Sequence, residues 1–187
     1  MTFDAQSDLA ALVYGAGEDP DPLIAGFAAD LHLAGHRPVG VVQRGRTCQS
    51  ENPQFGVVIL PDGEVVGLAT AEGAAVGCRL DPDRLAGLAV RLAAAIENGA
   101  DLVILNRFGH SEAEGKGLID LVPLALDADI PVLIAVPERR FASWIRFSEG
   151  MNVRLACRRD ALDQWWHGVT GPFCARRSAG TLCEFAK

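Results

Sequence analysis

Four short, almost wholly apolar stretches divide the chain, and each has the length of a buried strand. They are residues 9–14, 38–43, 101–106 and 131–136. Strands with apolar residues at successive positions are typical of a parallel sheet that is covered by helices on both faces. The pattern therefore predicts a sheet whose strands alternate with helices.

Apolar residues at helical spacing lie between these strands. The clearest case is residues 82–98, where Asp81 suits the N-cap and Gly99 the C-terminal stop. A helix is also predicted over 22–34, with Asp21 as its N-cap and Pro22 at its first position. Shorter helices are expected near 119–128, 138–148 and 160–167, and a short edge strand at 153–156.

The segment 55–68 has a different pattern. Two apolar runs, 55–60 and 65–68, flank Pro61-Asp62-Gly63, which is typical of an antiparallel hairpin. The fold class predicted is a three-layer α/β/α domain with a mostly parallel sheet and an antiparallel hairpin insertion. We expect one domain over residues 1–168 and an irregular tail over 169–187. Ligands of such sheets bind at the loops that leave the carboxyl ends of strands, here 15–21, 43–51, 106–117 and 136–139.

Composition narrows the classes of partner. Of the 187 residues, 49% are hydrophobic and 22% charged, and the net charge of −7 disfavours nucleic acid and anionic membranes. No apolar run approaches the roughly 20 residues of a membrane span, and no signal peptide is visible, so we expect a cytoplasmic protein. The five cysteines form no C-x-x-C pair, which favours reduced thiols.

The loop after the first strand stands where P-loop proteins hold phosphate. That motif, G-x-x-x-x-G-K-[ST], uses glycines for close backbone approach, a lysine against the phosphate and a hydroxyl on magnesium. Aligned on Gly15, it places Pro20 at the second glycine, Asp21 at the lysine and Pro22 at the hydroxyl residue. Proline has no N–H to donate, and each carboxylate repels a phosphate charge by about 1 to 4 kcal/mol at close range. We expect an acidic, helix-capping turn that does not bind ATP in the standard way.

The loop 106–117, NRFGHSEAEGKG, is the richest in reactive side chains. Its candidate ligand-binding residues are Asn106, Arg107, Gly109, His110 and Lys116. Glu112 and Glu114 are weaker candidates for a general base. A P-loop enzyme has a metal-binding carboxylate where this strand ends in Asn106, which carries no charge. A binding site and a catalytic site both remain open here.

Two further candidates come from neighbouring segments. Arg79 precedes the helix at 82, where its guanidinium suits either an anion or a local carboxylate. Gln43 ends the second strand and, with Arg44, Arg46 and Cys48 after it, could line the same site or belong to a solvated basic loop. His32 and His36 have chelating spacing, but Gly35 breaks the helix between them and no third ligand is near. The sequence therefore predicts no metal site, and it identifies no cofactor.

Several of these stretches together resemble one protein family. They are Ala11–Tyr14, Pro38–Gln43, Gly77–Pro82, Asp101–Gly117, Ile130–Pro137 and Trp144–Gly150. The pattern is similar to an uncharacterised bacterial domain-of-unknown-function family that is distantly similar to THEP-type nucleoside-triphosphatases of the P-loop class. The resemblance covers about residues 8–168, and the loop N-R-F-G-x-x-E-A-E-G-x-G is its most specific part.

The resemblance implies a degenerate P-loop scaffold without the Walker lysine. Because the family usually occurs near molybdate transport or molybdoenzyme genes, it also implies a role in molybdenum handling. The positions that match its signature are Gln43, Cys78, Arg79, Asn106, Phe108, Gly109, Glu112, Glu114, Gly115 and Gly117.

Three functions remain open at this point. The first is a non-catalytic ligand-binding or accessory protein that holds an oxyanion such as molybdate through backbone amides and Arg79, Arg107 or Lys116. The second is a regulatory interaction subunit whose partner is a molybdoenzyme-related protein, with a homodimer also left open. The third is a nucleotide hydrolase or phosphotransferase in which Glu112 or Glu114 is the base. We rank them in this order.

Overall fold

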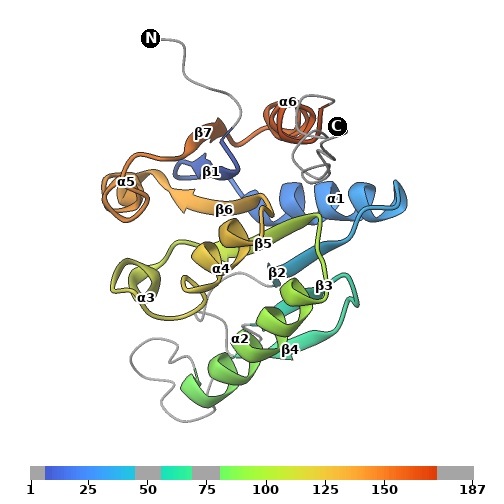
Figure 1. Cartoon of the computed structure of the whole chain (residues 1–187). Coiled ribbons are helices and arrows are strands. Elements are labelled where there is room, and N and C mark those ends of the chain that lie inside the picture. Colours follow the sequence, from blue (N-terminus) through green and yellow to red (C-terminus); the bar gives the residue numbers. More distant parts are fainter. Residues whose placement is uncertain (1–6, 45–55, 69–80, 172–187) are drawn as a thin grey trace, which may run out of the picture.

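Strands and helices alternate along the chain in this computed structural model, which describes residues 7–44, 56–68 and 81–171 (Figure 1). The strands are β1 (Leu9–Tyr14), β2 (Pro38–Arg44), β3 (Gly56–Leu60), β4 (Val65–Gly67), β5 (Leu102–Arg107), β6 (Val132–Pro137) and β7 (Val153–Ala156). The helices are α1 (Pro20–Leu33), α2 (Pro82–Glu97), α3 (His110–Ala113), α4 (Leu121–Asp127), the 3₁₀ turn η1 (Glu138–Arg140), α5 (Phe141–Phe147) and α6 (Arg159–Thr170).

The strands form one sheet in the order β4-β3-β2-β5-β6-β1-β7. Neighbouring strands from β2 to β7 in this order pair in parallel, whereas β3 pairs antiparallel with both β2 and β4. This confirms the predicted α/β class, the mostly parallel sheet and the antiparallel hairpin. The predicted edge strand is β7, which lies beside β1 at the end of the sheet.

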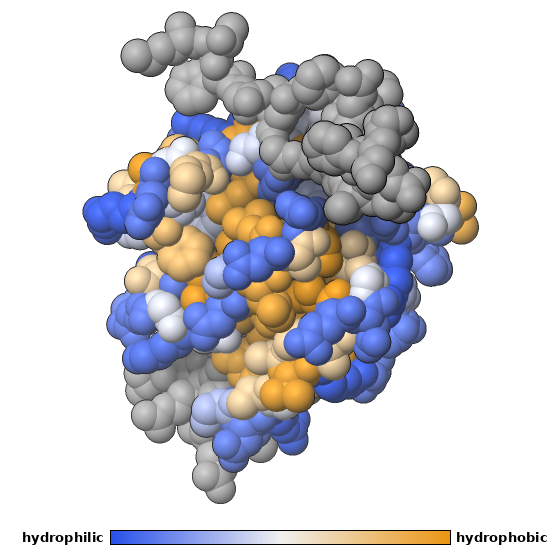
Figure 2. Space-filling view, in the orientation of Figure 1, coloured by the Kyte–Doolittle hydropathy of each residue, from blue (hydrophilic) through white to orange (hydrophobic). Residues whose placement is uncertain are grey.

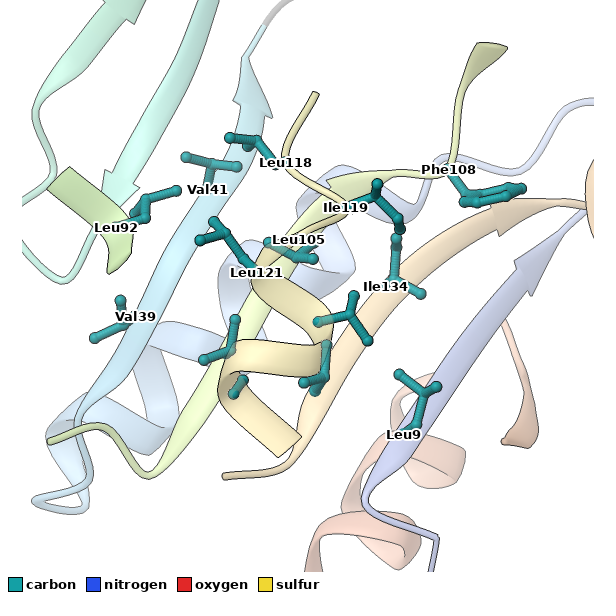
Figure 3. Packing of buried hydrophobic residues seen from close by; sticks show 14 of the residues in the cluster. Leu9, Val39, Val41, Leu92, Leu105, Phe108, Leu118, Ile119, Leu121 and Ile134 are labelled. Atoms are coloured by element: carbon teal, nitrogen blue, oxygen red, sulfur yellow. The ribbon is translucent and has the colours of Figure 1, made fainter. Parts of the chain in front are cut away.

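Alternate residues of the central strands feed two cores, one on each face of the sheet. Leu105 of β5 and Ile134 of β6 point into the core on the side of α2 and α4, where Leu121 meets them (Figure 3). Ile104 and Leu133, one position earlier on the same strands, belong to the opposite core with α1 and α6. Because both faces are covered, the central strands carry apolar residues at successive positions, which is the pattern that the sequence showed.

The helix ends agree with the prediction for α2 and differ for α1. Asp81 caps α2 by accepting hydrogen bonds from the N–H groups of Asp83 and Arg84. The α1 helix begins two residues before the predicted start, with Asp19 rather than Asp21 as its N-cap and Pro20 at its first position. The Asp-Pro pair occurs twice in a row here, and the first pair takes the cap. The predicted helix 160–167 is also longer, because α6 continues to Thr170.

Two local irregularities shape the end of β5. Gly40 of β2 has a φ of 141°, and a Cβ there would lie 1.9 Å from the carbonyl oxygen of Ile104. The two strands pair only as far as Gly40 and Ile104, after which β2 follows β3 instead. On its other side β5 carries a bulge, since Leu105 pairs with Ile134 and Arg107 with the very next residue of β6. Asn106 is therefore the extra residue of a β-bulge, which interrupts the regular alternation of side chains along β5.

The face on which α2 and α4 lie is uneven in polarity. Figure 2 shows hydrophobic residues gathered in the middle of this face, with hydrophilic residues around them. Among the exposed large hydrophobic residues of the described segments, Val90 of α2 is 71% exposed. Within those same segments, no helix is long and apolar enough to cross a membrane.

Candidate functional site

The loop after β1 is occupied by the protein's own side chains. The Gly15 N–H, the first amide of this loop, donates to the Glu18 carboxylate at 2.6 Å. Asp19 accepts from the N–H of Asp21 at the start of α1. In a P-loop protein these backbone amides face phosphate oxygens. Here carboxylates of the same chain take that place.

Arg107 closes this arrangement from β5. Its guanidinium donates to both carboxylate oxygens of Asp21, at 3.2 and 2.7 Å, and contacts Asp19 at 3.4 Å. It also donates to the Tyr14 hydroxyl at 3.3 Å and lies over the Tyr14 ring. The fork of an arginine fits a carboxylate in this two-point manner. The candidate cation Arg107 is thus bound to the first loop.

Burial acts on three members of this cluster, Asp21, Tyr14 and Arg107. It raises the pKa of Asp21, although Arg107 opposes the shift, and it raises the pKa of Tyr14. For Arg107 burial disfavours the charged form, but the hydrogen bond and charge of Asp21 outweigh it and the pKa of Arg107 is raised. Arg107 therefore stays charged, with Asp21 as its counter-ion.

A pocket opens where β2 and β5 separate, and it collects most of the candidate residues. Its volume is about 360 Å³. Its lining includes the candidates Gln43, Asn106, Arg107, Gly109, His110 and Glu112. The Asn106 side chain bridges the two strands: its oxygen accepts from the Gln43 backbone N–H at 3.2 Å, and its amide donates to the Gln43 side-chain oxygen at 3.3 Å. Hydrogen bonds between Gln43 and Asn106 thus connect β2 and β5 beyond Gly40 and Ile104, where their backbone pairing ends.

Glu112 is folded back into its own loop. Part of this loop, predicted as irregular, forms the short helix α3, and the Glu112 carboxylate accepts from the Gly109 N–H at 2.9 Å. Gly117, at a φ of 79°, lies so close that a Cβ there would be 2.5 Å from Glu112 Oε1. Burial raises the pKa of Glu112, while hydrogen bonds from its own N–H and from Gly109, and the charge of Arg140, oppose the shift.

We expect Glu112→Gln to stabilise the protein at neutral pH and to leave it unchanged in acid. A raised folded-state pKa favours folding below the ordinary value of 4.5 and disfavours it as the pH rises through the folded-state value. Glutamine keeps the acceptor for Gly109 and removes the buried charge. Urea unfolding at pH 4 and pH 7.5 measures the effect, with the exposed Glu114→Gln as the control. A variant less stable than the parent at pH 7.5 would contradict this expectation.

The remaining candidates lie outside the pocket. Lys116 and Glu114 form an ion pair at 3.0 Å on the outer surface of the loop, and His110 reaches the other Glu114 oxygen at 3.1 Å. Arg79, together with Cys78, falls outside the described residues. In the segments that the structure describes, no group of three or more His, Cys, Asp or Glu side chains could hold a metal ion.

The sequence did not single out the arginines that follow β6. Arg139 and Arg140 lie in η1, where their charges act on Tyr14 and Glu112. Within the described part of the chain neither forms an ion pair or a side-chain hydrogen bond, in contrast to Arg107. The sequence identified 136–139 as a loop at the carboxyl end of a strand. Two adjacent arginines in a short turn form no recognisable binding motif, so they were not named as candidates.

A larger cavity, about 710 Å³, lies on the opposite face between α1 and the β2–β3 hairpin. Its walls are mainly small and apolar, among them Ala25, Val42 and Leu60. The acidic groups at its rim, Asp19 and Asp21, are already bound to Arg107. His32, Gln43 and Arg44 also line this cavity, but most of the candidate residues line the smaller pocket.

Comparisons with known proteins agree with the fold and the resemblance. A family model described as "Protein of unknown function (DUF2478)" matches residues 9–165. The crystal structure of THEP1 from the hyperthermophile Aquifex aeolicus superposes with a TM-score of 0.60 at 14% identity, over 86% of this chain and 96% of that one.

A relative from Bradyrhizobium diazoefficiens is 39% identical over 167 residues, which is 87% of this chain. It is called "Molybdenum import ATP-binding protein ModC 2", and the match spans only 18% of its length. These findings confirm the predicted resemblance and the P-loop-like fold.

Proposed function

We propose that this chain, which belongs to the DUF2478 family, is a non-catalytic ligand-binding domain on a P-loop-like scaffold that serves molybdenum metabolism. The molybdenum role draws support from the printed name of the Bradyrhizobium relative. That name describes a protein much longer than this match, so its own activity is not transferred.

The observation that carries the proposal is the occupied first loop. A triphosphate needs the Gly15 amide, a cation in place of the missing lysine, and room at the start of α1. Glu18 takes the amide, and Asp19 and Asp21 take the charge of Arg107. The Gly15 amide and the nearby cation Arg107 are thus bound to carboxylates of the chain, which supports a scaffold without nucleotide turnover.

The ligand that we propose is a small oxyanion such as molybdate, held at the arginine pair after β6. Arg139 and Arg140 directly follow β6, which lies between β5 and β1 in the sheet, and they supply two positive charges not paired in the described segments. The earlier candidates Arg107 and Lys116 are bound to carboxylates. An oxyanion is expected to bind Arg139 and Arg140 in preference, because it does not have to displace a carboxylate from them.

Calorimetry with molybdate and tungstate tests this proposal. We expect saturable binding that weakens about tenfold in Arg139→Gln or Arg140→Gln, because each charge-assisted hydrogen bond contributes about 1.5 to 3 kcal/mol. Arg146→Gln, which alters an exposed arginine of α5, is the matched control. Absence of binding at about 1 mM anion, or phosphate release from nucleoside triphosphates with magnesium, would refute the proposal.

A second candidate is an interaction domain, favoured by the length of the Bradyrhizobium relative. There the matching segment is joined to other sequence that makes up most of the protein. The hydrophobic area in Figure 2 is a surface that a protein partner could cover. Co-purification with a molybdenum-import ATP-binding protein tests this function.

A further inference from the structure

The pocket between β2 and β5 has a lining that fits neither phosphate nor a free oxyanion. Two of its described side chains can carry a positive charge, and both are paired, Arg107 with Asp21 and His110 with Glu114. The half-buried carboxyl of Glu112 would repel an anion whenever it is charged. The lining therefore disfavours an anion, because its described cations are already paired.

Most of the pocket wall is aliphatic. Figure 3 shows Leu118 beside Val41 at one end of the core, with Leu105 and Ile134 on the next two strands. Leu85 of α2 and Val57 of β3 line it from other elements. Aliphatic walls contributed by strands on one side and a helix on another suit a flat, apolar ring, and about 360 Å³ lies in the range of small-molecule sites.

The polar groups of the pocket gather at its strand-end side. The Asn106 amide uses one donor and one acceptor on Gln43, and both of its polar atoms have a second hydrogen-bonding position. The Ser111 hydroxyl, which also lines the pocket, can both donate and accept. This edge offers paired neutral donors and acceptors, which match the N–H and C=O groups of a cyclic amide.

We propose that this pocket binds a neutral bicyclic heterocycle with a lactam edge, of the purine or pteridine type. The aliphatic walls contact the faces of the ring, and the lactam edge meets Asn106 and Ser111. The site differs from the proposed oxyanion site in its lining, which includes neither Arg139 nor Arg140, although the charge of Arg140 acts on Glu112 at its wall. It does not depend on the proposed function.

Calorimetry and ligand-observed NMR with hypoxanthine, xanthine and pterin test this inference on the full chain. We expect saturable binding of at least one of them. Comparison of the two purines with pterin then shows which ring system the pocket prefers. Ser111→Phe places a ring in the pocket and should weaken binding at least tenfold. Ala113→Phe, on the exposed side of the same short helix and outside the pocket, should leave binding unchanged.

Leu85→Trp fills the same pocket from α2 and is the second variant, with circular dichroism to confirm that each protein is folded. Binding that survives both filled variants, or no binding of any of the three compounds at about 1 mM, would overturn the inference. Molybdate titrations of the same variants separate the two sites. Loss of heterocycle binding with intact molybdate binding is the expected result for Ser111→Phe.

Discussion

Replacement of Gly40 by alanine is expected to lower the free energy of unfolding by about 3 kcal/mol or more, among the largest effects of a single methyl group. The new Cβ would lie 1.9 Å from the carbonyl oxygen of Ile104. That oxygen belongs to the backbone of the neighbouring strand, so no side-chain rotation relieves the clash. The φ of 141° is also unfavourable for any residue with a Cβ.

Urea unfolding of Gly40→Ala and of Gly87→Ala provides the measurement and its control. Gly87 lies exposed in α2, and a Cβ there meets nothing within 4 Å. Alanine at Gly87 should stabilise the helix by roughly 0.5 to 1 kcal/mol. Equal stability of the two variants would mean that β2 and β5 do not approach as closely as described.

Loss of Arg107 is expected to destabilise the protein by about 2 kcal/mol, because it leaves the largely buried Asp21 without its counter-ion. The value is below that of a fully buried pair, since the Arg107 side chain is 30% exposed. Arg107→Met keeps most of the packing volume. Because Asp21 without Arg107 is easier to protonate, the loss should shrink as the pH falls below the Asp21 pKa.

A double-mutant cycle with Asp21→Asn separates the ion pair from other effects of Arg107. The double variant should recover part of the loss, because it removes the unpaired charge. Arg91→Met is the matched control: Arg91 also meets both oxygens of a carboxylate, that of Glu64, but on the surface. Its loss should cost far less stability than that of Arg107, because both partners are exposed to solvent. Equal losses for Arg107 and Arg91 would show that the Arg107 pair has no special role.

The fold could be predicted from the sequence because its signals are local and agree with one another. Uninterrupted apolar stretches such as 102–105 indicated a sheet covered on both faces. Asp81, Pro82 and Gly99 defined α2 almost to the residue. The start of α1 was less certain, because Asp19-Pro20 and Asp21-Pro22 offer the same capping chemistry two residues apart. Only the observed dihedral angles and hydrogen bonds distinguish the first pair.

The candidate site could be predicted as a region but not as a set of contacts. The polar residues at the end of β5 were recognised, and six of the candidates line one pocket. The partner of Arg107 was not, because Asp21 lies 86 positions away in sequence. The acidic residues of the first loop indicated that it would repel phosphate. That the same residues bind Arg107 of β5 could be recognised only once the strand order β5-β6-β1 was known.

The bulge in β5 has a consequence for how members of this family can differ in length. Between Leu105 and Arg107 the register of β5 advances by two residues while that of β6 advances by one, from Ile134 to Ala135. Asn106 is therefore one residue more than a regular strand would have here. Asn106 reaches toward β2 and Arg107 toward β1, while Phe108 is returned to the core beside Trp144. A homologue shorter by one residue at this point must give up one of the two bridges. A gap at this position in an alignment would therefore mark a domain whose strand ends are held together differently.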